Sequence, residues 1–124
     1  MTTTLPSWMR NALFATAAMN LLAAIGFLPF AGGVRALAGL PPSEHAVYLT
    51  TVALFVGLFG LGYLWVAIAN RPERLFITLS AVGKIGFFTI LVALWLAGSL
   101  PVLAPLAGAA DLVFGLIFIA WLLG

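Results

Sequence analysis

Four long apolar stretches constrain this chain more than any other feature of its sequence. They occupy residues 8–30, 43–70, 72–97 and 101–123. Each reaches the length of about 20 residues that carries an α-helix across the hydrocarbon layer of a bilayer. The stretches lack the strict alternation of a transmembrane β-strand. Because lipid offers no hydrogen-bond partners to an exposed backbone, we expect all four to be helices.

The composition indicates the same class of protein. Of the 124 residues, 65% are apolar, and the mean hydropathy is +1.25. The five Lys or Arg and three Asp or Glu residues are too few to provide the polar surface of a small soluble domain. A disordered chain would be polar and rich in charge, so disorder is excluded as well. We therefore expect one all-α domain over residues 1–124, an integral membrane bundle of four transmembrane helices.

Proline, glycine and polar residues mark the ends of these helices. The breaks at residues 70–73 and 98–101 are short, which makes the flanking helices antiparallel neighbours. Ser43 is the expected cap of the second helix, and Pro72 the expected first residue of the third. The longer first connection contains residues 34–40, which form either a short interfacial helix or an irregular loop.

The distribution of basic residues predicts the orientation in the membrane. Arg10, Arg71 and Arg74 lie at one end of the expected bundle, whereas Arg35 alone lies at the other. Loops rich in Lys and Arg face the cytoplasm, so both termini are expected there.

Two opposite charges lie deep within the third and fourth stretches. Lys84 and Asp111 would each cost about 2.5–3.5 kcal/mol at the bilayer centre if left alone. A hairpin that turns near Ser99 places Lys84 level with a position near Phe114, about one helical turn from Asp111. A lysine side chain can cover that separation, so we expect a contact between Lys84 and Asp111, direct or through water.

Each stretch also has a face of small or polar residues that includes the centre of the membrane. Such faces let helices approach closely in lipid. If the four faces converge, Asn20 joins Lys84 and Asp111 in one polar core, and Tyr63 lies nearer the cytoplasmic side. The glycines expected at the packing contacts are Gly57, Gly60, Gly83, Gly108 and Gly115.

Two interpretations of this core remain open. A buried ion pair can simply fix the register of two helices and the choice of partner helix. Alternatively, the candidates Asp111, Lys84, Asn20 and Tyr63 bind a ligand, move a proton or gate a cavity. Glu44 and His45 open the second helix at the non-cytoplasmic mouth, where they either contact a ligand or serve the helix end.

The sequence lacks the residues that several kinds of functional site require. The chain has no cysteine and one histidine, so we expect no disulfide, metal centre or cofactor. Five scattered basic residues do not form a nucleic-acid surface. No familiar nucleophile–base spacing appears, so no residue is assigned a catalytic role.

Short motifs resemble those of small bacterial four-helix membrane proteins of the DoxX-like group. The resemblance rests on residues 59–64 (FGLGYL), a short basic turn, Gly83-Lys84, and Asp111 with Phe114. It implies a four-helix membrane fold in a bacterial inner membrane. Some members of that group are linked, as accessory subunits, to membrane-bound, quinone-coupled sulfur oxidation.

Three functions are compatible with the sequence. The first is a non-enzymatic membrane protein that binds a partner subunit or a small lipophilic ligand, such as a quinone, in the core. The second is a small proton-coupled transporter or channel that acts as an oligomer. The third is a membrane enzyme or an accessory subunit of a quinone-linked oxidoreductase.

Overall fold

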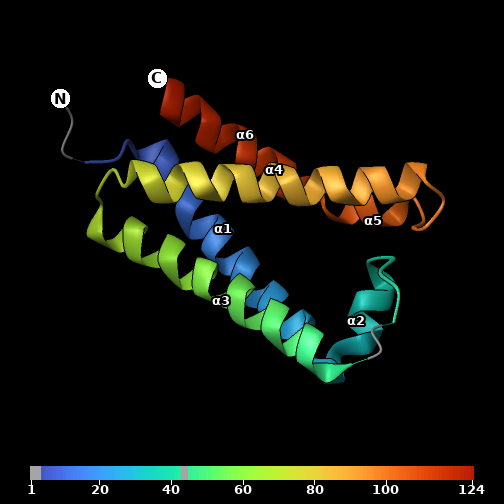
Figure 1. The fold of residues 1–124 in the computed structure, drawn as a ribbon. Helices are drawn as coiled ribbons and strands as arrows, with labels where there is room; N and C mark the ends of the chain where they lie inside the picture. Colours follow the sequence, from blue (N-terminus) through green and yellow to red (C-terminus); the bar gives the residue numbers. More distant parts are fainter. Residues whose placement is uncertain (1–3, 43–44) are drawn as a thin grey trace. The chain divides into compact units, whose positions relative to one another are not determined.

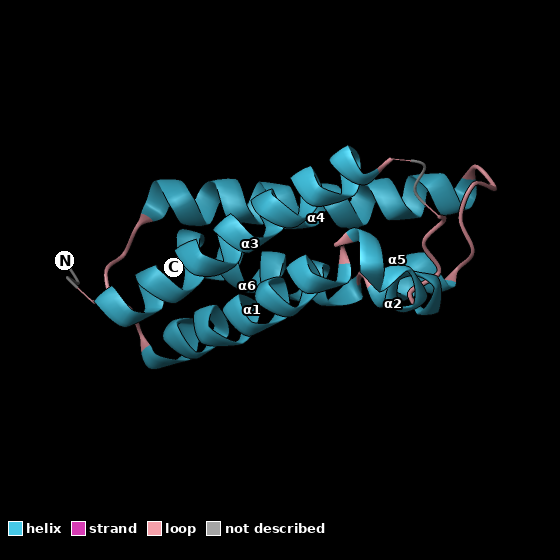
Figure 2. Ribbon diagram, turned by 90° about the horizontal axis from the view of Figure 1, so that it is seen from below, coloured by secondary structure: helices cyan, strands magenta, loops and turns pink. Residues whose placement is uncertain are grey.

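The computed structural model describes residues 4–42 and 45–124, and every regular element within them is a helix (Figures 1 and 2). The prediction of an all-α chain is thus confirmed for the described residues. In chain order the elements are α1 (Ser7–Gly26), the short 3-10 helix η1 (Pro29–Ala31), α2 (Gly32–Leu37), α3 (Ala46–Ala69), α4 (Arg74–Leu96), α5 (Leu103–Ala107) and α6 (Ala109–Leu123).

Two of these helices are long and apolar enough to cross a membrane. They are α3, with 24 residues, and α4, with 23. At 1.5 Å per residue, each is about 35 Å long, which exceeds the roughly 30 Å of a hydrocarbon layer. A third span is obtained if α1 and the segment Pro29–Leu37 are counted as one interrupted span. The apolar helix α6 is shorter, with 15 residues.

Glycines with a left-handed backbone end two of the helices. Gly98 (φ +83°) follows α4, and there Ser99 N–H donates to Leu94 O at 2.8 Å while Gly98 N–H donates to Trp95 O at 3.0 Å. This pair of hydrogen bonds satisfies carbonyls that a helix end leaves open, and it needs a residue without a Cβ penalty. Gly39 (φ +76°) ends α2 in the same way, so the first connection contains the short helix that was one of the two expected alternatives.

Three expected boundaries are corrected. The first helix ends at Gly26 rather than near residue 30, and η1 begins at Pro29, whose missing N–H cannot continue an α-helix. The third begins at Arg74, not Pro72, because Glu73 N–H first closes a turn onto Arg71 O at 3.0 Å. The expected cap Ser43 lies outside the described residues; His45 caps α3 instead, with Nδ1 accepting from Val47 N–H at 3.0 Å.

The fourth apolar stretch is not one helix but two. The helix α5 ends at Gly108, which has φ −84° and ψ 0°, and α6 begins at the next residue. Glycine costs about 1 kcal/mol in a helix interior relative to alanine, so the chain is weakly helical at Gly108. The break places the start of α6 within the apolar stretch.

The chain divides into two compact units. The first contains α1 and α3, which lie side by side (Figure 1). A Cβ at Gly57 would lie 3.5 Å from Ala24 Cβ, and one at Gly60 would lie 3.1 Å from Asn20 Cβ. The small-residue faces expected on these two helices therefore do meet. The second unit contains α2, most of α4, α5 and α6.

Polar contacts tie the start of α1 to the end of α3 in the first unit. Arg10 Nε donates to Ala67 O at 2.7 Å, which places a cation at the negative end of α3. Asn70, in the left-handed conformation (φ 54°), ends α3 and accepts from Leu5 N–H through Oδ1 at 3.1 Å. Asn70 thus serves both the backbone turn and the contact between segments.

Substitutions at Asn70 separate these two roles. We expect Asn70→Gly to lower the free energy of unfolding by about 1 kcal/mol, because it removes only the acceptor for Leu5 N–H. Alanine also lacks the polar side chain that helps asparagine to adopt the left-handed conformation. We therefore expect Asn70→Ala to lower the free energy of unfolding by about 2 kcal/mol. Thermal unfolding followed by circular dichroism in detergent micelles measures both. Thr89→Val, at an exposed position of α4, is the control and should change the free energy of unfolding by less than about 0.5 kcal/mol. Equal losses in Asn70→Gly and Asn70→Ala would contradict the assignment.

Candidate functional site

Lys84 lies near the middle of α4, in the second unit. Ser80 and Ala81, one turn earlier, are buried with it. The Ser80 hydroxyl donates to Phe76 O in its own helix at 2.7 Å, so it is satisfied without a partner helix. The Lys84 ammonium, by contrast, needs a polar or charged partner from another helix.

The helix α6 packs closely on α4 and brings that partner near. A Cβ at Gly115 would lie 2.7 Å from Ile85 Cγ1, and one at Gly108 would lie 2.5 Å from Leu91 Cδ1. The helix α6 thus runs antiparallel to α4 with Gly115 opposite Ile85. This register agrees with the expectation from a turn near Ser99, which places Lys84 level with a position near Phe114.

Lys84 and Asp111 form the predicted contact. Lys84 Nζ donates to Asp111 Oδ1 at 3.0 Å, as a direct hydrogen bond and salt bridge. The Lys84 ammonium also lies 5.8 Å from the centre of the Phe114 ring, within the range of a cation–π contact. The charges therefore neutralise each other between two neighbouring helices beside an aromatic ring.

The two partners differ in burial. The Lys84 side chain is 5% exposed, whereas the Asp111 side chain is 22% exposed. The break at Gly108 also corrects the expected position of Asp111, which is not near the middle of a helix but in the first turn of α6. A carboxylate in that turn is stabilised by the positive end of the helix dipole. The arrangement presents a carboxylate outward and keeps the ammonium inside.

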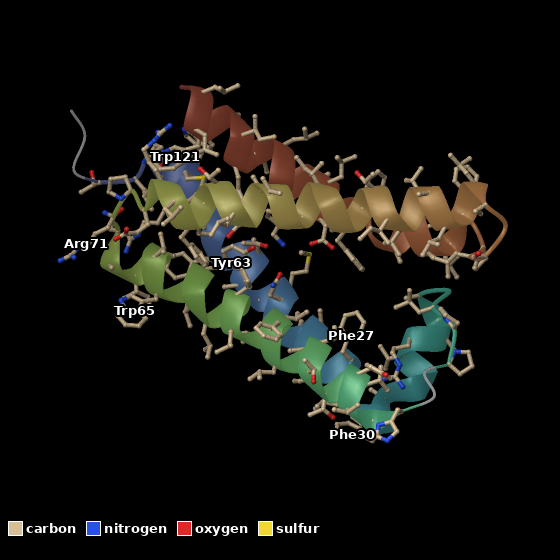
Figure 3. The ribbon with its side chains drawn as sticks, in the orientation of Figure 1. Phe27, Phe30, Tyr63, Trp65, Arg71 and Trp121 are labelled. Carbon is tan, nitrogen blue, oxygen red and sulfur yellow. The ribbon has the colours of Figure 1, made fainter. Side chains whose placement is uncertain are left out.

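The other two core candidates lie in the first unit. Asn20 Nδ2 donates to Val56 O at 3.2 Å, which ties α1 to α3. Tyr63 is buried, with its ring centre 6.2 Å from that of Phe59 (Tyr63 is labelled in Figure 3). The structure thus brings Lys84 together with Asp111 and places Asn20 beside Gly60. The union of all four faces in one polar core stays a prediction.

The expected non-cytoplasmic mouth is described in part. Glu44 lies outside the described residues. His45 is exposed and caps α3, and its ring meets the Tyr48 ring edge to face, with centres 6.3 Å apart. The alternative that His45 serves the helix end is therefore confirmed, and a ligand contact stays a prediction.

Four of the five expected packing glycines meet a neighbouring segment. These are Gly57, Gly60, Gly108 and Gly115. Gly83 is the exception, because a Cβ added there meets nothing within 4 Å and the residue is exposed. Its place one residue before Lys84 turns it away from the face that packs on α6, so a packing role for Gly83 stays a prediction.

Two further polar residues are buried. Arg35 of α2 is 8% exposed, although it served only as a topology marker in the sequence. Thr16 of α1 is fully buried, and its hydroxyl has no hydrogen-bond partner in residues 4–42 and 45–124. Thr16 lies on the small-residue face of its helix with Ala17, Asn20 and Ala24, whereas no local pattern shows that a neighbouring segment will cover Arg35.

The described part of the chain contains no group of three or more His, Cys, Asp or Glu residues that could hold a metal ion. No family model, curated protein or solved structure matches the chain. The resemblance to DoxX-like proteins therefore stays a prediction, and the chemistry of the Lys84–Asp111 pair is the basis for any functional conclusion.

Proposed function

We propose that this chain is a non-enzymatic integral membrane protein that binds a small lipophilic ligand beside the Lys84–Asp111 pair. One observation supports this function above the others. The Asp111 carboxylate accepts from Lys84 through one oxygen while 22% of its side chain remains exposed, in a helix made almost entirely of apolar residues. An ionisable group at such a position is more costly than a purely structural contact requires.

The membrane location in this proposal rests on the helices and on their ends. The helices α3 and α4 are long enough to span, and we propose that α1 and the pair α5–α6 complete a four-helix arrangement with antiparallel neighbours. Trp65, which is 76% exposed, and Arg71 lie toward the C-terminal end of α3, and Phe30 lies at the other end of the α1–α3 pair (Figure 3). Tryptophan and arginine at one end suit a membrane interface on the cytoplasmic side. Both termini then face the cytoplasm, and a bacterial inner membrane is the proposed location.

A ligand rather than a catalytic step is proposed because of what surrounds the pair. The Phe114 ring lies beside the Lys84 ammonium, and Ile85 and Gly115 meet where α4 and α6 pack. These three residues offer apolar surface to a ligand and carry no acid, base or nucleophile. The pair can fix one polar group of a lipophilic molecule, and the flanking apolar surface can hold the remainder.

Photolabelling in lipid nanodiscs tests the proposal. The probe is 1-dodecanol that carries a diazirine on its chain. We expect it to label peptides of α4 and α6 near Asp111 and to be displaced by excess unlabelled dodecanol. The double variant Lys84→Met/Asp111→Asn removes both charges and is expected to lose at least ten-fold in labelling of these peptides.

Thr89→Val is the matched control, because Thr89 is an exposed residue of α4 whose hydroxyl bonds only to Ile85 O of its own helix, at 2.8 Å, among the described contacts. It should label like the wild type. Labelling spread evenly over all apolar helices, with no displacement by dodecanol, would contradict the proposed function. Because this outcome is measured on the wild-type protein alone, the test stands even if the double variant fails to fold.

A further inference from the structure

The direction of the Lys84–Asp111 pair restricts which ligands can use it. The cation is the inner partner, at 5% exposure, and the carboxylate is the outer partner, at 22%. A molecule that approaches from outside α4 and α6 therefore meets negative charge first. The ammonium lies behind the carboxylate and beside the Phe114 ring, where it balances the charge of Asp111.

The hydrogen bonds of Asp111 leave an acceptor open. Lys84 Nζ donates to Oδ1, and within the described part of the chain no donor reaches Oδ2. A carboxylate oxygen can accept hydrogen bonds but cannot donate them while it is ionised. In apolar surroundings a hydrogen bond to an ionised group is stronger than one between neutral groups.

From these observations we infer that the site selects lipophilic molecules that donate a hydrogen bond, an alcohol, phenol or amine group, through Asp111 Oδ2. This inference rests on the proposed function, and it names the ligand class of the same site. Molecules that offer only acceptors, such as esters, cannot bond to Oδ2. Lipophilic anions meet the outward carboxylate and are repelled, since Lys84 is already engaged from within.

A panel of four twelve-carbon probes tests the inference on the wild-type protein. The probes are 1-dodecanol, dodecylamine, methyl dodecanoate and dodecanoate, each used to displace the photoreactive dodecanol from the peptides of α4 and α6 in nanodiscs. We expect dodecanol and dodecylamine to displace it with an apparent Kd at least ten-fold lower than either of the other two, as one charge-assisted hydrogen bond allows. If only one of the two donors does so, that donor identifies the head group as hydroxyl or amine, and the inference still holds.

Equal or better displacement by methyl dodecanoate or dodecanoate would overturn the inference and leave the proposed function in place, because a ligand would still occupy the site. By contrast, absence of displaceable labelling by any probe would remove the proposed function itself. Thr89→Val should reproduce the wild-type order of the four probes. The comparison uses only folded wild-type protein and this control, so instability of a charge variant cannot mask the outcome.

Discussion

Replacing Lys84 with methionine is expected to lower the free energy of unfolding by about 3–5 kcal/mol, one of the two largest effects that the structure predicts. The substitution leaves the Asp111 carboxylate without the donor that lies 3.0 Å from Oδ1. An unpaired charge in apolar surroundings has neither water nor counter-charge to replace its hydration. Asp111→Asn should have an effect of the same order, because it removes the counter-charge of the more deeply buried ammonium. Unfolding in detergent micelles, followed by the loss of helical circular dichroism, measures both variants.

The double variant shows how the two charges are coupled. Lys84→Met/Asp111→Asn leaves no unpaired charge, so it should be more stable than either single variant, although each residue has been lost. Thr89→Val again serves as the control, with an expected change within about 0.5 kcal/mol for an exposed position. If the losses of the two single variants simply add in the double variant, Lys84 and Asp111 do not stabilise each other.

The same double variant separates the structural interpretation of the pair from the functional one. A pair that only fixes helix register leaves the double variant folded and indifferent to lipophilic probes, as the wild type would be. A pair that binds a ligand leaves the double variant folded but unable to retain the dodecanol probe that the wild type holds. Stability and binding therefore have to be measured on one set of variants.

The Lys84–Asp111 contact could be predicted from the sequence because few quantities determine it. A short turn at residues 98–101 fixes which helices are neighbours, and the constant rise per residue fixes which positions are level. The expected register, with Lys84 level with a position near Phe114, agrees with the observed meeting of Gly115 and Ile85. The cost of an isolated charge in an apolar helix then requires the two side chains to meet.

The break at Gly108 could not be predicted in this way. Neither Pro105 in a first helical turn nor a single glycine interrupts a helix by itself, and both occur in continuous transmembrane helices. The break coincides with a tertiary contact that the sequence does not show, because a Cβ at Gly108 would lie 2.5 Å from Leu91 Cδ1. Asp111 was therefore expected near a helix centre, whereas it lies in the first turn of α6.

Burial of the remaining polar residues also depends on tertiary neighbours. Arg35 carries no periodic or pairwise signal of its own, yet it is buried. Gly83 precedes Lys84 directly in the sequence, yet a Cβ added there meets nothing within 4 Å. A pattern of small residues indicates which helices can approach closely, but it does not identify which member of the pattern makes the contact.

Replacing Gly115 with leucine is expected to lower the free energy of unfolding by about 3 kcal/mol, at the upper end of the effects of overpacking. Even a Cβ at this position would lie 2.7 Å from Ile85 Cγ1 and 3.6 Å from Ala81 O. Isoleucine is β-branched, so the Cγ1 atom of Ile85 cannot rotate away freely. The helices α4 and α6 would have to separate, and the Lys84–Asp111 contact, one turn from Gly115, would lengthen with them. The variant should therefore lose the dodecanol probe as well as stability, which photolabelling and thermal unfolding measure together.

A second substitution on the facing helix tests whether this steric contact is the cause. Ile85→Ala removes the Cγ1 atom that the new side chain would meet, so Gly115→Ala combined with Ile85→Ala should be more stable than the sum of the two single effects predicts. Gly83→Ala, on α4 but with nothing within 4 Å of its Cβ, is the matched control and should be neutral or slightly stabilising, because alanine favours a helix more than glycine does. Equal destabilisation by Gly83→Ala and Gly115→Ala would mean that loss of glycine flexibility, not the approach of α6 to α4, sets the cost. In that case the ion pair, and not the contact between Gly115 and Ile85, would hold Asp111 beside Lys84.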